Sequence, residues 1–174
     1  MENALVNGEF EVRFQPQYDQ TAGTVVSAEA LIRWRHPQRG MLRPDEFIPI
    51  FEKNGFIRNL DAYVRDRCCA FIRRRMEAHE PIVPISVNVS RVDLYAPDFC
   101  EHMESLLEKY QLSPAVLRLE ITESVCRDMP QQMMEILKKL RSQGFFIEMD
   151  DFGKGYSSLN CLKDIPLDLI KLDM

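Results

Sequence analysis

The chain has 174 residues, of which 45% are hydrophobic and 28% are charged, as is typical of one folded globular domain. Its net charge of −5 provides no basic surface for phosphate contacts, which argues against binding to a DNA or RNA duplex. No apolar run approaches the ~20 residues that span a bilayer, and the first residues show no signal-peptide pattern, so we expect neither feature. The five cysteines include no CxxC pair and are odd in number, so we expect reduced thiols and a cytoplasmic protein.

The first half of the chain contains two predicted strands and two predicted helices. Apolar and polar residues alternate over positions 10–15, and a turn at 21–24 leads into a second strand over 25–34. Alternation in the second strand puts Glu29, Leu31 and Arg33 on one side. A glutamate in so apolar a strand is costly unless another group pairs with it. Pro44 predicts the start of a helix, and a longer amphipathic helix follows from about Ile57.

The second half alternates between predicted strands and helices. Strands are expected over 85–90, 117–122, 144–150 and 167–173, with amphipathic helices near 99–107 and over 130–142 and a short helix over 156–162. Gly144 is a good candidate for the residue that ends the helix over 130–142. Strands that alternate with helices from Val25 onward favour a parallel sheet with helical crossovers.

The fifth strand runs into two adjacent carboxylates, Asp150 and Asp151, and then into a loop that contains Gly153 and Gly155. Strand alternation places the two aspartates on opposite faces. Adjacent carboxylates at the end of a buried strand repel each other and are costly to desolvate. A Mg²⁺ or Mn²⁺ ion would relieve both problems. The simpler alternative is a turn in which Asp151 caps the next helix.

Polar residues also occur near the carboxyl ends of the other strands. In a β/α barrel these ends converge on one face, where active sites are built. The matching positions therefore favour a functional site over incidental polar residues. These positions are Glu29, Asn88, Glu120, Asp150 and Lys171.

Several ordered motifs resemble the EAL domain family, the cyclic-di-GMP phosphodiesterases. The similarity runs from about Gly8 to the last residue and covers nearly the whole chain. Its motifs are Gln15-Pro16, Ala-Glu-Ala-Leu-Ile-Arg-Trp at 28–34, Asn-Val-Ser at 88–90, Leu-Glu-Ile-Thr-Glu-Ser at 119–124, Asp-Asp-Phe-Gly-Lys-Gly-Tyr-Ser-Ser at 150–158 and Lys-Leu-Asp at 171–173.

The resemblance implies a role for each matching residue in the metal-dependent hydrolysis of cyclic-di-GMP to linear pGpG. Lys171 and Asp151 match catalytic positions, and Glu123 matches a residue that stabilises the loop after Asp151. The residues that match ligands of a two-metal Mg²⁺ or Mn²⁺ site are Glu29, Asn88, Glu120, Asp150, Asp151 and Asp173. The residues that match contacts to the dinucleotide are Gln15, Leu31 and Arg33.

The resemblance also implies an α/β fold, a TIM-like (β/α) barrel of the EAL type. Such a barrel takes ~250 residues, so residues 1–174 are expected to form a partial EAL domain of about six strands that lacks the closing strands. The family's later catalytic residues would also be absent, so we expect this chain alone to be inactive. The alternative is a non-catalytic EAL module that binds cyclic-di-GMP or a protein partner. Other expected partners are a second copy, paired or swapped at the open barrel edge, and a fused sensor or GGDEF domain in a longer parent.

Two positions depart from the family pattern. Lys154 replaces a usual threonine, and Glu148 replaces a small apolar residue on the face that points into the barrel. Arg118 precedes Glu120 by two residues, just as Glu148 precedes Asp150 on the next strand. Because either charge alone would be costly there, we predict an Arg118–Glu148 ion pair, with Lys171 as a competing partner for Glu148.

Overall fold

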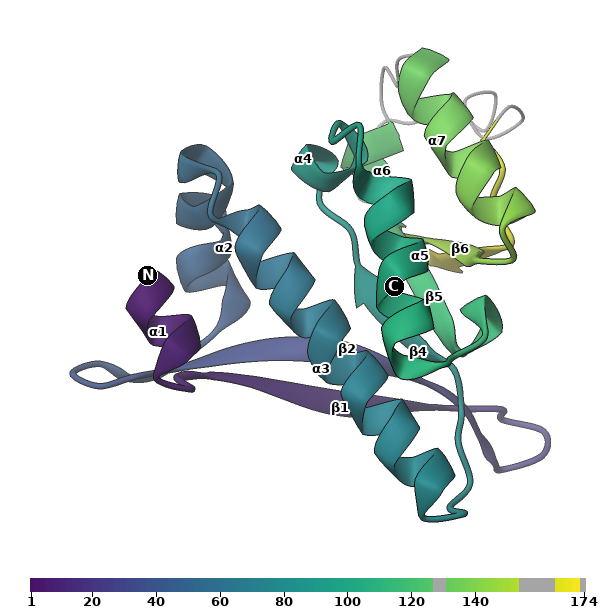
Figure 1. Cartoon of the computed structure of the whole chain (residues 1–174), viewed down its shortest axis with the longest axis horizontal. Helices are drawn as coiled ribbons and strands as arrows, with labels where there is room; N and C mark the ends of the chain where they lie inside the picture. Colours follow the sequence, from purple (N-terminus) through teal and green to yellow (C-terminus); the bar gives the residue numbers. More distant parts are fainter. Residues whose placement is uncertain (127–130, 154–164, 173–174) are drawn as a thin grey trace. The chain divides into compact units, whose positions relative to one another are not determined.

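The computed structural model describes residues 1–126, 131–153 and 165–172 (Figure 1). The chain divides into two compact units, Met1–Val87 and Asn88–Met174. The predicted short helix over 156–162, Lys154 and the predicted metal ligand Asp173 lie outside the described residues. No helix in the described ranges is both long enough and apolar enough to cross a membrane.

The first unit is built on a long antiparallel hairpin of β1 (Phe10–Tyr18) and β2 (Val25–His36). A short strand, β3 (Gly40–Leu42), pairs antiparallel with the far end of β2. On its other side, β2 pairs in parallel with the start of β4 (Ile85–Asn88), whose last residue belongs to the second unit. Figure 1 shows the long helix α3 (Ile57–Glu77) running across this hairpin, which it contacts on both strands.

An aromatic cluster forms the core at one end of the first unit. Phe10 of β1 stacks on Trp34 of β2 with a ring-centroid distance of 5.2 Å, and Phe47 and Phe51 of α2 (Pro44–Asn54) pack edge-on against Phe10 at 6.1 Å. Leu60 of α3 is fully buried beside these rings. The short helix α1 (Glu2–Val6) contributes Ala4 to the same core.

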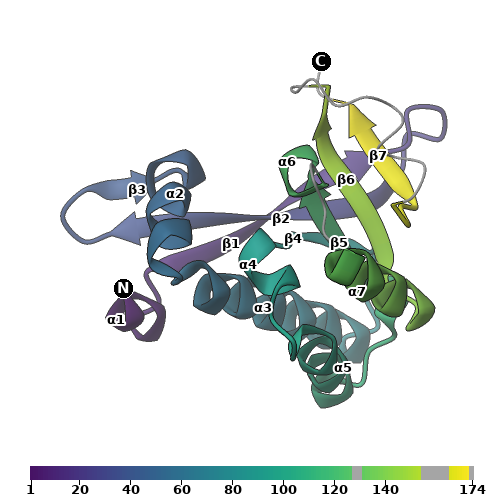
Figure 2. The same cartoon turned by 90° about the horizontal axis from the view of Figure 1, so that it is seen from above.

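The second unit contains three parallel strands, in the order β5 (Leu117–Thr122), β6 (Phe146–Phe152) and β7 (Leu169–Leu172). Figure 2 shows β6 and β7 side by side. Two amphipathic helices, α5 (Phe99–Tyr110) and α7 (Gln131–Ser142), contact each other, and α7 also contacts β6. The other elements among the described residues of this unit are α4 (Arg91–Leu94), a 3₁₀ turn over Pro114–Val116 and α6 (Glu123–Cys126).

Alternation along β5 and β6 buries one face of the strands. Leu119 and Ile121 of β5 and Ile147 and Met149 of β6 are each 0–1% exposed. Gly144 ends α7 with φ = 96°, and the amide of Phe145 donates to the Leu140 carbonyl at 3.1 Å. The predicted role of this glycine is confirmed, because the left-handed region favours glycine.

The predicted α/β class with parallel strands and intervening helices is confirmed. The sequence patterns did not predict α1, β3, α4 or α6, each of which spans only three to five residues. Elements this short contain too few residues for a hydrophobic period to be recognised.

Candidate active site

A β-bulge lies at the two aspartates of β6. Met149 pairs with Ile170 and Phe152 pairs with Leu172, so Asp150 and Asp151 together lie opposite the single residue Lys171. Asp151 has φ = 59°, a left-handed conformation that aspartate tolerates better than most residues. The regular alternation expected from the sequence is therefore interrupted at Asp151. Bulges of this kind re-aim side chains and are frequent beside active sites.

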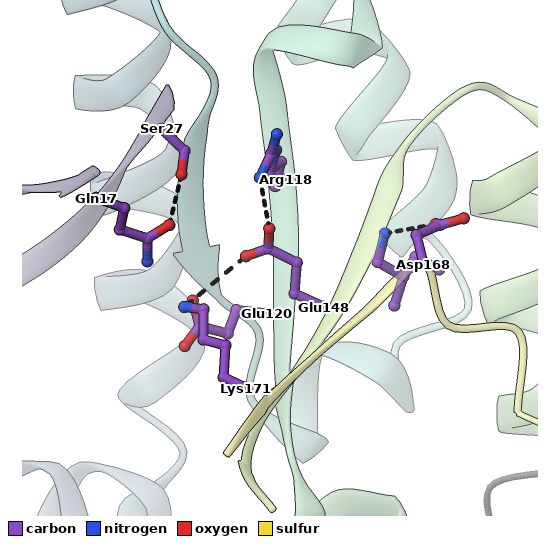
Figure 3. Close-up of polar contacts among 8 residues, drawn as sticks. Gln17, Ser27, Arg118, Glu120, Glu148, Asp168 and Lys171 are labelled. Atoms are coloured by element: carbon purple, nitrogen blue, oxygen red, sulfur yellow. Dashed lines mark hydrogen bonds and ion pairs between the residues drawn. The ribbon is translucent and has the colours of Figure 1, made fainter. Parts of the chain in front are cut away.

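Lys171 reaches from β7 to the buried carboxylate of Glu120 on β5. Its Nζ lies 2.5 Å from Glu120 Oε2 and 3.8 Å from Glu148 Oε2 (Figure 3). The Glu120 side chain is fully buried, whereas that of Lys171 is 17% exposed. The sequence placed these residues at corresponding strand ends, and the structure brings their charged groups into direct contact.

The predicted Arg118–Glu148 ion pair is confirmed. Arg118 Nη1 donates to Glu148 Oε1 at 2.9 Å, and the Glu148 side chain is only 1% exposed. The guanidinium of Arg118 also lies over the Phe146 ring, 4.7 Å from its centroid. The predicted competitor Lys171 also approaches Glu148, at its other carboxylate oxygen.

Asn88 and Glu123 occupy the remaining predicted positions in the second unit. The Asn88 side chain is exposed, and the next residue, Val89, donates its amide to the Glu120 carbonyl at 2.8 Å. Glu123 is 4% exposed, and its Oε2 accepts a hydrogen bond from the Gly153 amide at 2.9 Å. This bond links the start of α6 to the residue that follows β6.

Asp168 fastens the start of β7 to β6, a role that the sequence analysis missed. Its Oδ2 accepts from the Ile147 amide at 3.0 Å, and its own amide donates to the Ile147 carbonyl at 2.9 Å. Arg141 of α7 donates to Asp168 Oδ1 at 2.9 Å. The motif Leu-Asp-Leu at 167–169 gave no local signal for these contacts, because all of the partners are more than 20 residues away.

The first unit holds the other predicted site residues on its hairpin. Gln15 of β1 lies directly opposite Glu29 of β2, and Ser86 of β4 is the parallel neighbour of Glu29 on the other side. Leu31 and Arg33 follow Glu29 on the same face of β2, as alternation predicts. Glu29, Leu31 and Arg33 are partly buried, and Arg33 donates to the Ile32 carbonyl at 2.8 Å.

The donor set suits a hard divalent cation in chemistry and in charge. In the second unit, four carboxylates (Glu120, Glu148, Asp150 and Asp151) lie on β5 and β6 together with two cationic side chains, Arg118 on β5 and Lys171 on β7. The excess of two negative charges matches one Mg²⁺ or Mn²⁺ ion, which prefers oxygen ligands. Within the described ranges, however, no three His, Cys, Asp or Glu side chains converge closely enough to hold an ion.

The described cysteines are poor candidates for nucleophiles. Cys68, Cys69 and Cys100 are buried free thiols. Burial raises the pKa of Cys68, with a smaller contribution from neighbouring Cys69. Burial also raises the pKa of Cys100. Neutral, enclosed thiols react slowly, so we assign these three residues to the core.

A cavity of about 360 Å³ in the first unit contains none of the predicted site residues. It opens between the hairpin, the end of α3 and the segment before β4. Its lining is apolar except for Arg75, which donates to the Pro81 carbonyl at 3.0 Å and pairs with Glu80 at 2.9 Å. The lining residues are Phe14, Val25, Ala28, Phe71, Ile72, Arg75, Pro81, Ile82, Val83 and Ile85.

The chain has the features of an α/β domain in which charged residues lie near the carboxyl ends of parallel strands. The family model described as "EAL domain" matches residues 1–174, and the chain therefore belongs to the EAL domain family. EAL domains are TIM-like barrels.

Relatives from Pseudomonas aeruginosa carry names that refer to cyclic-di-GMP. The chain is 36% identical to "Cyclic di-GMP phosphodiesterase NbdA" over 173 residues, which are 99% of this chain and 22% of NbdA. It is also 36% identical to "Cyclic di-GMP phosphodiesterase RocR", over 97% of this chain and 43% of RocR. The chain thus spans less than half the length of these relatives.

The solved structure described as "PaMucR Phosphodiesterase, c-di-GMP complex" is similar to this chain with a TM-score of 0.91 and 33% identity. The match covers 99% of this chain and 70% of that one. The FimX EAL domain of Pseudomonas aeruginosa, bound to c-di-GMP, has a TM-score of 0.86 but is only 22% identical, so it supports the fold alone.

Proposed function

We propose that the chain is part of a cyclic-di-GMP phosphodiesterase, which adds water across one phosphodiester bond of the dinucleotide to give linear pGpG. The observation that carries the proposal is the bulge that sets Asp150 and Asp151 opposite Lys171. Family membership and the names of the relatives support the same reaction. The ammonium of Lys171 and the carboxylates of Asp150 and Asp151 lie near the carboxyl ends of neighbouring strands.

Each site residue has a role in this proposal. The residues that would hold a Mg²⁺ or Mn²⁺ ion are Glu29, Asn88, Glu120, Asp150 and Asp151, together with Asp173, which lies outside the described residues. A bound divalent cation supplies stabilisation of the charge that develops on the phosphoryl oxygens. The ammonium of Lys171, together with Asp151, orients the attacking water, and Glu123 holds the loop through the Gly153 amide. Gln15 and Leu31 contact the dinucleotide, and Arg33 offers its guanidinium to a phosphate.

A second candidate is a non-catalytic EAL module that binds cyclic-di-GMP. The observation that favours it is the 2.5 Å contact between Lys171 Nζ and Glu120 Oε2, which engages an oxygen that a metal ligand would need. In this alternative, the ammonium of Lys171 occupies the position beside Glu120 that a Mg²⁺ or Mn²⁺ ion would take in the enzyme.

The two candidates are separated by incubating the chain with cyclic-di-GMP and Mg²⁺ or Mn²⁺ and measuring pGpG by chromatography and dinucleotide binding by calorimetry. Product from the native chain, reduced at least about a hundredfold in Glu120→Gln, would support the phosphodiesterase and overturn the expectation from the sequence that this chain alone is inactive. Glu29→Ala should lose the product as well. The control is Glu135→Gln, which alters an exposed carboxylate on α7 and should leave the rate unchanged.

Binding without product would favour the second candidate. A native chain that neither binds the dinucleotide nor releases pGpG would refute both proposals.

A further inference from the structure

Four charged side chains form a continuous chain of ion pairs across β5, β6 and β7 (Figure 3). Arg118 Nη1 lies 2.9 Å from Glu148 Oε1, Glu148 Oε2 lies 3.8 Å from Lys171 Nζ, and Lys171 Nζ lies 2.5 Å from Glu120 Oε2. The sequence of charges is therefore positive, negative, positive, negative. We refer to these four residues as the ion-pair chain.

The strand register explains why the charges alternate. Glu120 and Glu148 are direct partners across the parallel β5–β6 pair, and both are at most 1% exposed. Two buried carboxylates in facing positions repel each other strongly. Lys171 approaches both carboxylates, and Arg118 neutralises the far side of Glu148. The ion-pair chain therefore depends on both cations.

Within the ion-pair chain, Glu148 connects Arg118 at one end to Lys171 and Glu120 at the other. Arg118 binds one of its oxygens, and that bond leaves the other oxygen facing Lys171. Among the described residues, Lys171 therefore has at least two carboxylates, those of Glu120 and Glu148, within 4 Å. A flexible ammonium with two fixed anions around it has fewer accessible positions than one with a single anion, since side-chain rotamer freedom is lost.

We propose that Glu148, held by Arg118, is a positioning residue that fixes the ammonium of Lys171 beside Glu120 and opposite the Asp150–Asp151 bulge. This inference rests on the proposed phosphodiesterase function, in which Lys171 orients the attacking water. Glu148 itself does not touch the reacting atoms. It acts through Lys171, and Arg118 acts through Glu148.

A purely structural role for the pair predicts something different. If Arg118 and Glu148 served only to satisfy each other, their replacement would change stability and leave Lys171 where it is. If Glu148 positions Lys171, neutralising Glu148 changes the environment of the Lys171 ammonium even in a fully folded chain.

The test compares Glu148→Gln with the native chain in two measurements. The first is the side-chain ¹⁵N–¹H spectrum of lysine ammonium groups in the metal-free chain, with the Lys171 signal assigned by Lys171→Arg. We expect Glu148→Gln to shift this signal and to speed its hydrogen exchange with water severalfold. The matched control is Glu135→Gln, which removes the same charge from the exposed Glu135–Lys138 pair and should leave the Lys171 signal unchanged.

The second measurement is the steady-state hydrolysis of cyclic-di-GMP with Mn²⁺. We expect kcat of Glu148→Gln to fall roughly tenfold to a hundredfold with KM nearly unchanged, because a misplaced catalytic group lowers the rate more than binding. Should Glu148→Gln fail to fold, the double variant Arg118→Met/Glu148→Met removes both charges together and carries the same expectations for Lys171.

The outcomes separate the inference from the function on which it rests. An unchanged Lys171 signal in a folded Glu148 variant overturns the inference whatever the activity, and so does an unchanged kcat in an active chain. A shifted Lys171 signal in a chain that makes no pGpG supports the positioning by Glu148 and refutes the phosphodiesterase instead.

Discussion

Replacing Arg118 by methionine should destabilise the chain more than replacing Glu148 by glutamine. Arg118→Met leaves the carboxylate of Glu148 at 1% exposure without the group that binds its Oε1. Loss of one partner from a buried ion pair costs about 3–5 kcal/mol. The Lys171 ammonium, 3.8 Å away, offsets part of that cost. We therefore expect a loss of about 3 kcal/mol in the free energy of unfolding, near the lower end of this range.

Glu148→Gln is expected to cost less because Arg118 keeps other interactions. The glutamine carbonyl can still accept the Arg118 hydrogen bond, and the guanidinium is 20% exposed and lies over the Phe146 ring. A weakened charge-assisted hydrogen bond corresponds to about 1–2 kcal/mol. The double variant Arg118→Met/Glu148→Met should lie within about 1 kcal/mol of the native chain, because two apolar groups of similar volume often replace a buried pair without loss.

The measurement is urea unfolding followed by far-ultraviolet circular dichroism. The dependence of the unfolding free energy on urea concentration is compared between variants, because a changed slope would mean that more than stability has changed. The control is Lys138→Met, which removes an exposed pair with Glu135 and should change stability by less than about 1 kcal/mol. The reasoning would be refuted if Glu148→Gln were the more damaging single change. A double variant that loses as much as the two single variants combined would also refute it, because paired residues should couple.

Three further changes test other parts of the structure. Gly144→Ala should cost about 1–2 kcal/mol in a urea titration, because φ = 96° disfavours any L side chain; an unchanged midpoint would contradict the left-handed geometry. Glu123→Ala should speed hydrogen exchange of the Gly153 amide at least tenfold, measured by NMR, because a hydrogen bond to a charged acceptor is lost. Leu60→Ala should cost about 2–5 kcal/mol in the aromatic core of the first unit. Ile50→Ala, at a residue that is 51% exposed, should lower the free energy of unfolding far less. Equal losses in the two variants would contradict the expectation that burial determines the cost.

The sequence predicted the main strands and helices because their hydrophobic periods are long enough to recognise. The predicted strand over 117–122 coincides with β5, and the helix expected from Pro44 begins at that residue in α2. Periodicity is a local property, so it survives without knowledge of strand partners. The short strand β3 has no such period, and it is a strand only because Met41 and Leu42 pair with the end of β2.

The Arg118–Glu148 pair was predictable from the spacing of residues along each strand and from the expected order of the strands. Each residue precedes a site carboxylate by two positions, and β5 and β6 were expected to be neighbours. The contact between Lys171 and Glu120 was not predictable in the same way. It joins β7 to β5 across β6, so it depends on the length and rotamer of the lysine side chain and not on the strand register alone.

The bulge at Asp150 and Asp151 shows most clearly where local patterns stop. Alternation assigns the two aspartates to opposite faces, and the pairing with β5 stays regular as far as Asp150. Beyond that point the conformation of β6 is set by its pairing with β7, where two residues lie opposite Lys171. One left-handed residue is enough to change which side chains can act together. The residue types needed for the proposed chemistry can therefore be recognised in the sequence, whereas their arrangement around Lys171 depends on the pairing of β6 with β7.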